Sequence, residues 1–441
     1  MFEKKKKDTV TASNETVEVM NNIPEDQNTK EEKLFYQRFL IDEKDFGPFL
    51  QFIKDDDITD INFNGSDLWT IDCHNKHEKQ DIDVTKNFID QFAMKVANAG
   101  GKTYNQKNPV LEAETSDLRI SIVHESIAVT GTSVCIRKTP PFSRIKERTA
   151  IEEKYCTKEI MSLIVNCIKA HMNIIVCGLP HVGKTECCKF FSQYIPDDER
   201  VITVEDNTEW RYKDIKPEAD CISMRTNKNF GYIDAIVASL RQDPQWLMIA
   251  ETRGKEVHEF MEGLTTGVNG MSTLHSGSIS RIPARMFSMS GGDDNGFKEN
   301  IYDFIDVGVQ VKFKRNPDGT QYRYISQVGF FYNDGDSGQI CEVVKNGNVI
   351  RRVLPTCMEE RMREYDITDY FKNADVDNNL RQQGADIEEI ERRERDIAQR
   401  IKEDLSKPSE LRAKRKRREE EDNVVYRSNF DNAPEVVQIE P

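Results

Sequence analysis

The sequence of 441 residues has no long apolar run and is short of positive charge. No stretch approaches the roughly 20 apolar residues that a membrane-spanning helix needs, and the lysine-rich start has no apolar segment behind it. We therefore expect a chain that neither spans a membrane nor is exported. Lys and Arg total 62 against 77 Asp and Glu, a net charge of −15. Attraction to nucleic acid as a property of the whole molecule is excluded, and the sequence gives no strong evidence for direct nucleic-acid binding.

Paired cysteines are also missing. The ten cysteines form no CxxC pair and no cysteine–histidine cluster at zinc spacing, which excludes the common structural zinc sites. Several lie in apolar runs such as NIIVC at residues 173–177. This pattern favours reduced, buried thiols in a cytosolic protein over disulfides.

The first part of the chain has the pattern of a small α+β domain. Residues 1–32 are polar and without periodicity, so we expect them to be disordered. Two prolines, Pro140 and Pro141, indicate a linker after the domain. Between these limits the expected elements are helices over 34–52 and 86–98, two short strands joined at Asn64-Gly65-Ser66, and strands at 118–125 and 133–138.

From about residue 155 the pattern changes to alternating helices and short apolar strands. Such strands, separated by helices, are typical of a parallel sheet that is covered on both faces. Beyond about residue 306 the sequence returns to alternating strands broken by turns. The expected strands of the parallel sheet are 173–177, 201–205, 221–224, 246–250 and 271–274, with helices over 158–170, from 183, and over 232–241.

The most specific motif is a complete G-x4-G-K-[ST] pattern that directly follows the strand at 173–177. Its glycines, Gly178 and Gly183, let backbone N–H groups turn toward a phosphate at a helix N-terminus. Lys184 adds a full positive charge, and the Thr185 hydroxyl is a ligand for Mg²⁺. A glycine-rich turn with an exposed lysine is the alternative. The remaining residues of the predicted phosphate-binding loop are Leu179, Pro180, His181 and Val182, of which His181 is expected to face solvent.

Polar residues follow three later strands of the predicted sheet. Ligands of open α/β sheets bind at the carboxyl ends of strands, so these positions are candidates for catalysis. Taken alone, each carboxylate is more typical of a helix cap and the histidine of a structural residue. Their order downstream of a phosphate-binding loop favours a role in catalysis. They are Glu205, Asp206 and Glu209 after the second strand, Glu251 with Arg253 after the fourth, and His275 after the fifth.

These motifs resemble those of the traffic ATPases of type II and type IV secretion. The segments GLPHVGKT, VITVEDNTEW, SLRQDPQWLMIAETRGKE and GVNGMSTLHSGS are similar to the Walker A, Asp box, Walker B and His box of that family, and most similar to its tight-adherence pilus and conjugative branch. DITDINFNGSDLW and DLRISIVHESIAVTGTSVCIRKT resemble the N-terminal domain of that branch. The similarity extends over residues 35–330.

The resemblance implies an α/β fold with a P-loop NTPase core of the RecA-like type behind a small α+β domain. It also implies a homo-oligomeric ring, typically a hexamer, with ATP and Mg²⁺ as cofactors. We expect a cytoplasmic protein that is peripheral at the membrane face and acts with inner-membrane secretion or pilus components. The expected parts are a tail over 1–32, an α+β domain over 33–140, a linker over 141–155, a motor domain over 156–355, and a charged helical tail over 356–441.

The family also implies roles for particular residues. Glu205 matches the glutamate that polarises attacking water, and His275 matches the histidine that senses the γ-phosphate. Glu251 matches the Walker B glutamate and is expected to hold Mg²⁺ together with Thr185, through water. The arginines expected to reach the nucleotide phosphates, where guanidinium groups stabilise charge, are Arg119, Arg137, Arg225 and Arg241.

The sequence departs from the family around its Walker B strand, so three functions stay open. Gln245 and Ala250 stand where the family often has aspartate and glycine, which leaves slow hydrolysis possible. The first function is an ATPase that powers secretion, conjugation or pilus assembly. The alternatives are a nucleotide-gated scaffold with little turnover and a P-loop kinase, for which the sequence offers no acceptor pocket.

The end of the chain is highly charged. Residues 380–401 have a marginal heptad pattern, and a basic run at 411–418 is followed by acidic residues 419–422. A solvated charged helix and a docking site for a membrane-embedded partner or an anionic lipid surface both fit this pattern.

Overall fold

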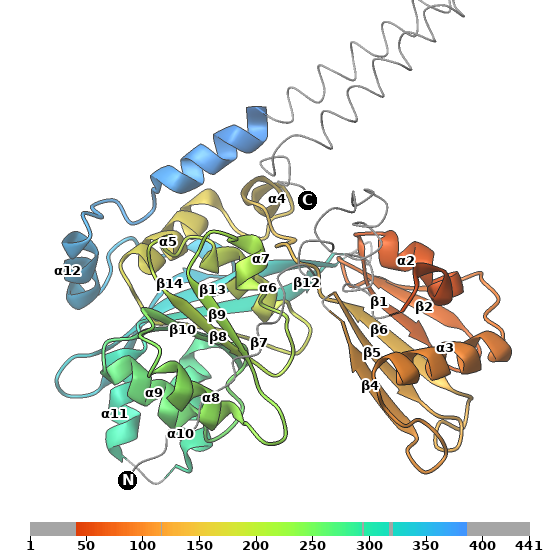
Figure 1. The fold of residues 1–441 in the computed structure, drawn as a ribbon. Helices are drawn as coiled ribbons and strands as arrows, with labels where there is room; N and C mark the ends of the chain where they lie inside the picture. Colours follow the sequence, from red (N-terminus) through yellow and green to blue (C-terminus); the bar gives the residue numbers. More distant parts are fainter. Residues whose placement is uncertain (1–40, 116, 293–294, 317–320, 386–441) are drawn as a thin grey trace, which may run out of the picture. The chain divides into compact units, whose positions relative to one another are not determined.

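A computed structural model describes residues 41–115, 117–292, 295–316 and 321–385. The chain divides into two compact units between Thr139 and Pro140 (Figure 1). The expected N-terminal tail, residues 34–40 of the first expected helix, and the basic and acidic runs near the C-terminus lie outside the described residues.

The first unit is a six-stranded antiparallel sheet with helices packed on one face. The sheet order is β3-β2-β1-β6-β5-β4. Helix α3 begins after Thr85, whose hydroxyl accepts the Phe88 N–H, and it buries Ile89, Phe92 and Val96 in the core of this unit. The elements are η3 (Glu43–Phe49), α2 (Leu50–Lys54), β1 (Ile58–Phe63), β2 (Leu68–Asp72), β3 (His77–Gln80), α3 (Lys86–Ala99), β4 (Val110–Glu114), β5 (Leu118–Val123) and β6 (Ser133–Lys138).

The second unit is built on a nine-stranded sheet of order β15-β14-β13-β12-β7-β11-β10-β8-β9. The six strands from β12 to β9 pair in parallel, and β13 to β15 extend the sheet in antiparallel fashion. Its elements are α4 (Glu147–Glu152), α5 (Lys158–Lys169), β7 (Ile174–Gly178), α6 (Lys184–Ser192), β8 (Val201–Glu205), α7 (Tyr212–Ile215), β9 (Cys221–Arg225), α8 (Tyr232–Ser239), β10 (Trp246–Ile249), α9 (Val257–Thr265), β11 (Asn269–His275), η4 (Ile279–Arg281), α10 (Ile282–Ser290), α11 (Asn295–Phe304), β12 (Val307–Arg315), β13 (Gln321–Asn333), β14 (Gly338–Lys345), β15 (Asn348–Val349) and α12 (Thr356–Glu364).

Helices cover both faces of the parallel strands, as the continuous apolar strands predict (Figure 1). Strand β7 shows this, because Ile174 and Val176 pack in one core with residues of α5 and α6. Ile175 and Cys177 point to the other face and pack with α8 to α11. The expected α/β class with a RecA-like P-loop core behind a small α+β domain is confirmed.

The structure corrects the expected charged tail over residues 356–441 for its described part. Met358, Met362, Phe371 and Val376 are buried in the same core as α5 and α6. On α5, the Asn166 side chain is buried, and its amide donates to the backbone carbonyls of Asp369, Tyr370 and Lys372. The buried apolar residues are few among many charged ones, which is why the sequence pattern predicted a charged tail. Residues 356–385 therefore belong to the second unit.

The expected linker over residues 141–155 also differs from the structure. Residues from Pro140 onward belong to the second unit, and α4 forms within them. Ala150, Tyr155 and Cys156 are buried in its core. Two further elements that the sequence did not predict are the edge strands β3 and β4, of which β3 is polar and mostly exposed.

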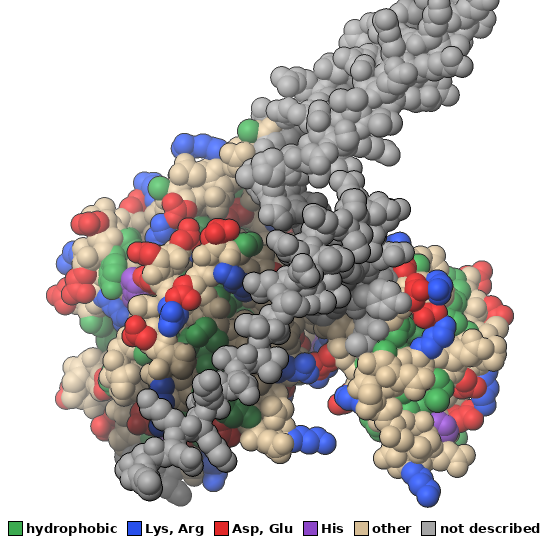
Figure 2. All heavy atoms as spheres, viewed as in Figure 1, with side chains coloured by type: hydrophobic (Ala, Val, Ile, Leu, Met, Phe, Trp, Pro, Cys, Tyr) green, Lys and Arg blue, Asp and Glu red, His purple; other side chains and the backbone are tan. Residues whose placement is uncertain are grey.

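None of the described helices is long and apolar enough to cross a membrane. On the face shown in Figure 2, acidic and basic side chains are interspersed rather than gathered by sign. Among the ten free cysteines, six are buried, including Cys177 and Cys187.

Candidate functional site

The predicted phosphate-binding loop joins β7 to α6, as the motif requires. Gly183 has a φ of 86°, a left-handed conformation that favours glycine, and α6 begins at the next residue. Gly178 is enclosed, because a Cβ there would lie 2.6 Å from the Val311 carbonyl oxygen. Leu179, Pro180 and His181 are exposed between them. The backbone therefore turns tightly at the N-terminus of a helix, where it favours anions.

Lys184, His275 and Glu251 form a continuous chain of polar contacts beside this loop. The Lys184 Nζ lies 3.1 Å from His275 Nδ1 and 3.3 Å from the Leu179 carbonyl oxygen. On the other side of the imidazole, His275 Nε2 lies 2.7 Å from Glu251 Oε1. The structure thus brings together three of the predicted site residues.

The position of His275 between an ammonium and a carboxylate fixes its proton. Burial, together with the Lys184 ammonium, lowers the pKa of His275 below its ordinary value, so the ring is neutral at pH 7. Since the Lys184 ammonium only donates, Nδ1 accepts its hydrogen bond, and in a neutral ring the proton is then on Nε2. Burial also lowers the pKa of Lys184, while Glu251 opposes this effect.

Arg253 continues this series of polar contacts on the far side of Glu251. The sequence had not predicted a role for it. Its Nε and Nη2 lie 2.7 and 2.6 Å from Glu251 Oε2, and its Nη1 lies 3.1 Å from Asp206 Oδ2. The Asp206 N–H in turn donates to the Tyr232 hydroxyl. The signal was present in the sequence, because Arg253 follows Glu251 by two residues in ETRG.

The strand register explains why distant segments meet here. In the parallel sheet, His275 of β11 pairs with Gly178 of β7, and Ile249 of β10 pairs with Val204 of β8. The carboxyl ends of four strands therefore share one edge. Buried hydroxyl groups connect the strands at this edge. Thr273 Oγ1 donates to the Ala250 carbonyl at 2.6 Å, and Thr252 Oγ1 lies 2.8 Å from Ser272 Oγ.

Glu205 ends β8 at the same edge but turns into its own loop. Only 3% of the residue is exposed, and Oε1 accepts the Trp210 and Glu209 N–H groups at 2.7 and 3.2 Å. Burial raises the pKa of Glu205 to about 7, against the lowering effect of these two hydrogen bonds. The carboxyl group is therefore close to half-ionised at neutral pH. Its expected role toward water stays a prediction.

The predicted arginines fall into three places. Arg225 ends β9 and pairs in register with Glu205, so it lies at the site edge. Arg241 follows α8 and lies beside Gln242, whose carbonyl accepts a hydrogen bond from Arg200 at the start of β8. Arg241 is therefore at the opposite edge of the sheet, and within one chain the fold does not bring it to the loop.

Arg119 and Arg137 belong to the first unit. They are cross-strand partners on β5 and β6, half-buried, on the sheet face away from α3. Arg137 Nε donates to Asp60 Oδ1 at 2.7 Å, which orients its guanidinium along the sheet. Their predicted contact with a nucleotide remains a prediction.

A further cation beside the loop was missed by sequence reasoning. The Arg323 side chain of β13 packs against Gly183, since a Cβ at residue 183 would lie 3.3 Å from Arg323 Cδ. The guanidinium also lies over the Phe313 ring at 4.9 Å from its centre. Residue 323 is distant in sequence, and only the pairing of β12 with β7 and with β13 brings it here.

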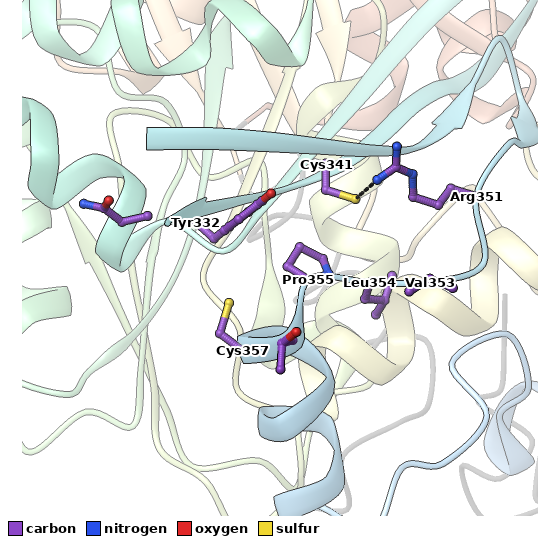
Figure 3. Close-up of a pocket in the computed structure, with 9 residues that line it drawn as sticks. Tyr332, Cys341, Arg351, Val353, Leu354, Pro355 and Cys357 are labelled. Carbon is purple, nitrogen blue, oxygen red and sulfur yellow. Dashed lines mark hydrogen bonds between the residues drawn. The ribbon is translucent and has the colours of Figure 1, made fainter. Parts of the chain in front are cut away.

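A cavity of about 410 Å³ lies away from the phosphate-binding loop. Figure 3 shows Arg351 directed at the Cys341 sulfur, with an Nη1–Sγ distance of 3.5 Å. The register of β13 with β12, and of β12 with β7, places this cavity toward the amino end of β7. It is lined by Tyr332, Asn333, Cys341, Arg351, Val353, Leu354, Pro355, Thr356 and Cys357.

The residues at the loop fit a phosphate group. Lys184 is 8% exposed, and its hydrogen-bond partners among the described residues are neutral, so the buried ammonium is complemented by an added anion. Thr185, the second residue of α6, and Glu251 provide oxygen ligands of the kind Mg²⁺ uses. Within the described ranges there is no group of three or more His, Cys, Asp or Glu that could hold a metal ion.

The match to a known family covers most of the chain. A model described as "Type II/IV secretion system protein" matches residues 108–425. The chain belongs to this family. The expected recognition of a type II/IV secretion family is therefore confirmed.

Individual proteins and solved structures are similar to parts of the chain. The chain is 29% identical over 273 residues to an uncharacterized protein of Bacillus anthracis, covering 60% of this chain and 62% of that protein. It is 26% identical over 188 residues to the type IV secretion system protein VirB11 of Bartonella quintana, covering 38% and 52%. The match thus spans less than two thirds of either relative. Among solved structures, the ATPase DotB of Yersinia pseudotuberculosis matches with a TM-score of 0.49 and 15% identity, covering 71% of this chain and 81% of that one.

Proposed function

We propose that this member of the type II/IV secretion family is a Mg²⁺-dependent ATP hydrolase. The observation that carries the proposal is the contact chain from Lys184 through His275 to Glu251 beside a glycine loop. It joins a phosphate-binding cation, a neutral imidazole and a carboxylate at one sheet edge. This combination suits phosphoanhydride hydrolysis, in which positioning and electrostatic stabilisation supply most of the catalysis.

Each residue has a physical role in this proposal. ATP supplies the phosphoanhydride bond, and Mg²⁺ neutralises the charge of its phosphates. Lys184 and the loop N–H groups bind the phosphates, while Thr185 and Glu251 hold the metal through water. An anion in the loop competes with His275 for the Lys184 ammonium, so the imidazole contact changes with occupancy. Glu205, half-ionised near neutral pH, is the group that accepts a proton from water.

We further propose that the chain forms a ring, with six subunits expected, and powers a type IV secretion, conjugation or pilus machine. Its work takes place at the cytoplasmic face of the inner membrane, with membrane components of that machine as partners. The family match and the similarity to a VirB11 protein support this assignment. A ring also offers a role for Arg241. This residue lies at the sheet edge opposite to the phosphate-binding loop of its own chain, so it could contact only the nucleotide of a neighbouring subunit.

Two substitutions test the hydrolase. In Lys184→Ala, loss of a charged hydrogen-bond donor should weaken binding of a fluorescent ATP analogue roughly 10- to 100-fold. Glu251→Gln should keep that affinity within about threefold and reduce phosphate release at least tenfold, because binding does not need the charge that orients the metal. Glu262→Gln, an exposed position on α9, is the matched control. Release by Glu251→Gln at the wild-type rate would contradict the site.

The same assay separates hydrolysis from the scaffold function. The scaffold alternative is favoured by Ala250, which is 8% exposed in the Walker B segment where the family often has glycine. Equal, near-background phosphate release by wild type and Glu251→Gln, with ATP-analogue binding intact, would establish the scaffold and remove the motor proposal.

A further inference from the structure

The two residues that join the units, Thr139 and Pro140, each make a backbone hydrogen bond within their own unit. The Thr139 N–H donates to the Asp117 carbonyl at 2.7 Å within the first unit. In the second unit, the Pro140 carbonyl accepts a hydrogen bond from Lys189 Nζ at 2.6 Å. Two consecutive residues are thus fixed to different units, and Pro140 and Pro141 have φ angles restricted by their rings. Residues 139–144 are called the hinge segment below.

The second unit holds the hinge segment with the helix that starts at the phosphate-binding loop. Lys189 and Glu186 both belong to α6, one turn or less beyond Thr185. The Glu186 carboxylate accepts hydrogen bonds from the Arg144 N–H and, at 3.2 Å, from the Ser143 hydroxyl. One helical turn therefore binds the hinge segment at three points, and its N-terminus forms the phosphate site.

Lys189 is an unusual choice for a structural contact. The residue is 2% exposed, and burial lowers the pKa of its ammonium, partly offset by Glu186. A buried ammonium is costly, and an apolar side chain would fill the same space without that cost. What Lys189 adds is a donor aimed at the hinge carbonyl.

The next turn of α6 contacts the loop after Glu205. The Ser192 hydroxyl donates to the Lys189 carbonyl at 3.0 Å and accepts from Trp210 Nε1 at 3.2 Å. The Trp210 N–H is one of the two groups that hold Glu205. A displacement of α6 would therefore move the groups that contact the hinge segment and the loop from Glu205 to Trp210.

We propose that Lys189 and Glu186 are positioning residues that transmit the state of the phosphate site to the first unit by clamping the hinge segment onto α6. The inference rests on the proposed function, since it assumes that nucleotide binding at the loop is the signal. Neither residue touches the phosphates in this assignment. Their removal should leave nucleotide binding intact and uncouple it from movement of the first unit.

The test is Lys189→Met, which keeps the length and apolar stem of the side chain and removes the donor. Fluorescent ATP-analogue affinity should stay within about threefold of wild type. Tryptic cleavage after Arg144 should accelerate roughly tenfold, and kcat for phosphate release should fall roughly tenfold at unchanged KM, since a lost charged hydrogen bond shifts an equilibrium by about this factor. Lys216→Met, which removes a lysine contact to the Ile195 carbonyl outside the hinge segment, is the matched control.

The outcomes are distinct. If Lys189→Met matches Lys216→Met in both cleavage and kcat, the clamp is wrong. If Lys189→Met does not fold by circular dichroism, Glu186→Ala takes its place with the same expectations, because it releases the Arg144 N–H and the Ser143 hydroxyl while the Lys189 side chain keeps its length and its donor. If wild type neither binds nor hydrolyses ATP, the proposed function fails, while the cleavage difference between Lys189→Met and Lys216→Met still decides whether the clamp exists.

Discussion

Burial of the Glu205 carboxyl group makes this protein sensitive to pH near neutrality. Its pKa is raised from an ordinary 4.5 to about 7, so between these pH values the folded chain binds a proton that the unfolded chain has released. The free energy of unfolding therefore falls as pH rises through this window. The contribution of this single group is about 3 kcal/mol.

Glu205→Gln should remove this pH dependence. We expect the free energy of unfolding, measured by urea denaturation, to fall less steeply for Glu205→Gln than for wild type between pH 5 and pH 7.5. Other buried acids, such as Asp306, titrate equally in both proteins, so the difference between the curves isolates Glu205. Glu218→Gln, at an exposed position, should follow the wild-type curve. Parallel curves for Glu205→Gln and wild type would contradict the raised pKa.

The rate of ATP hydrolysis should also depend on the ionisation of Glu205, but it should rise with pH where the free energy of unfolding falls. Only the ionised carboxylate accepts a proton, so the wild-type rate should rise with pH through about 7. Glu205→Gln should be slow at every pH. A wild-type rate that is flat from pH 6 to pH 8 would assign proton transfer to another residue.

For individual residues, the sequence predicted well which side chains lie at the site. It predicted less well which groups those side chains contact. The motifs named Lys184, Glu251 and His275, and the strand register brings them together. The direction of the Glu205 side chain could not be predicted, because it depends on the loop that ends at Trp210. Lys189 carried no signal, since a lysine within an amphipathic helix is ordinarily solvated.

Among the elements, the junction of β7 with α6 is tightly packed at Gly178. Gly178 is the last residue of β7, and its missing side chain lets the β12 backbone pass beside the loop. The sequence predicted β7 and α6 from one motif. It did not predict that β12 pairs with β7, because pairing between distant strands is not encoded in local pattern.

Gly178→Ala should therefore damage the phosphate site through sterics. The added Cβ would lie 2.6 Å from the Val311 carbonyl oxygen and 2.7 Å from Val182 Cγ2, so the loop must shift. We expect ATP-analogue affinity to fall roughly tenfold or more, since overpacking a tight site costs on the order of 1–3 kcal/mol. Gly277→Ala is the control, because a Cβ there meets nothing within 4 Å. Equal affinities for the two variants would show that the loop tolerates the shift.

At the scale of the whole molecule, residues 356–385 are part of the second unit rather than an appendage to it. The buried Glu147 carboxylate of α4 accepts hydrogen bonds from Asn379, at 2.8 Å, and from Gln383. The Arg148 N–H donates to the Gln383 side chain at 3.0 Å. Helix α4, near the beginning of the second unit, is therefore joined to residues 379–383, and charge patterning alone could not predict this contact.

Two truncations test this closure. Ending the chain after residue 385 keeps these contacts, whereas ending it after residue 374 removes Asn379, Gln383 and the fully buried Val376. Because Glu147 then loses donors in a buried position, the shorter chain should have a Tm lower by on the order of 5 °C. Glu147→Gln, in the chain that ends after residue 385, isolates the contribution of the carboxylate. If the two truncated chains unfold at the same temperature, the segment contributes no stability. The basic run at 411–418 is tested by comparing the membrane recovery of the full chain with that of either truncated chain, since both truncated chains lack it.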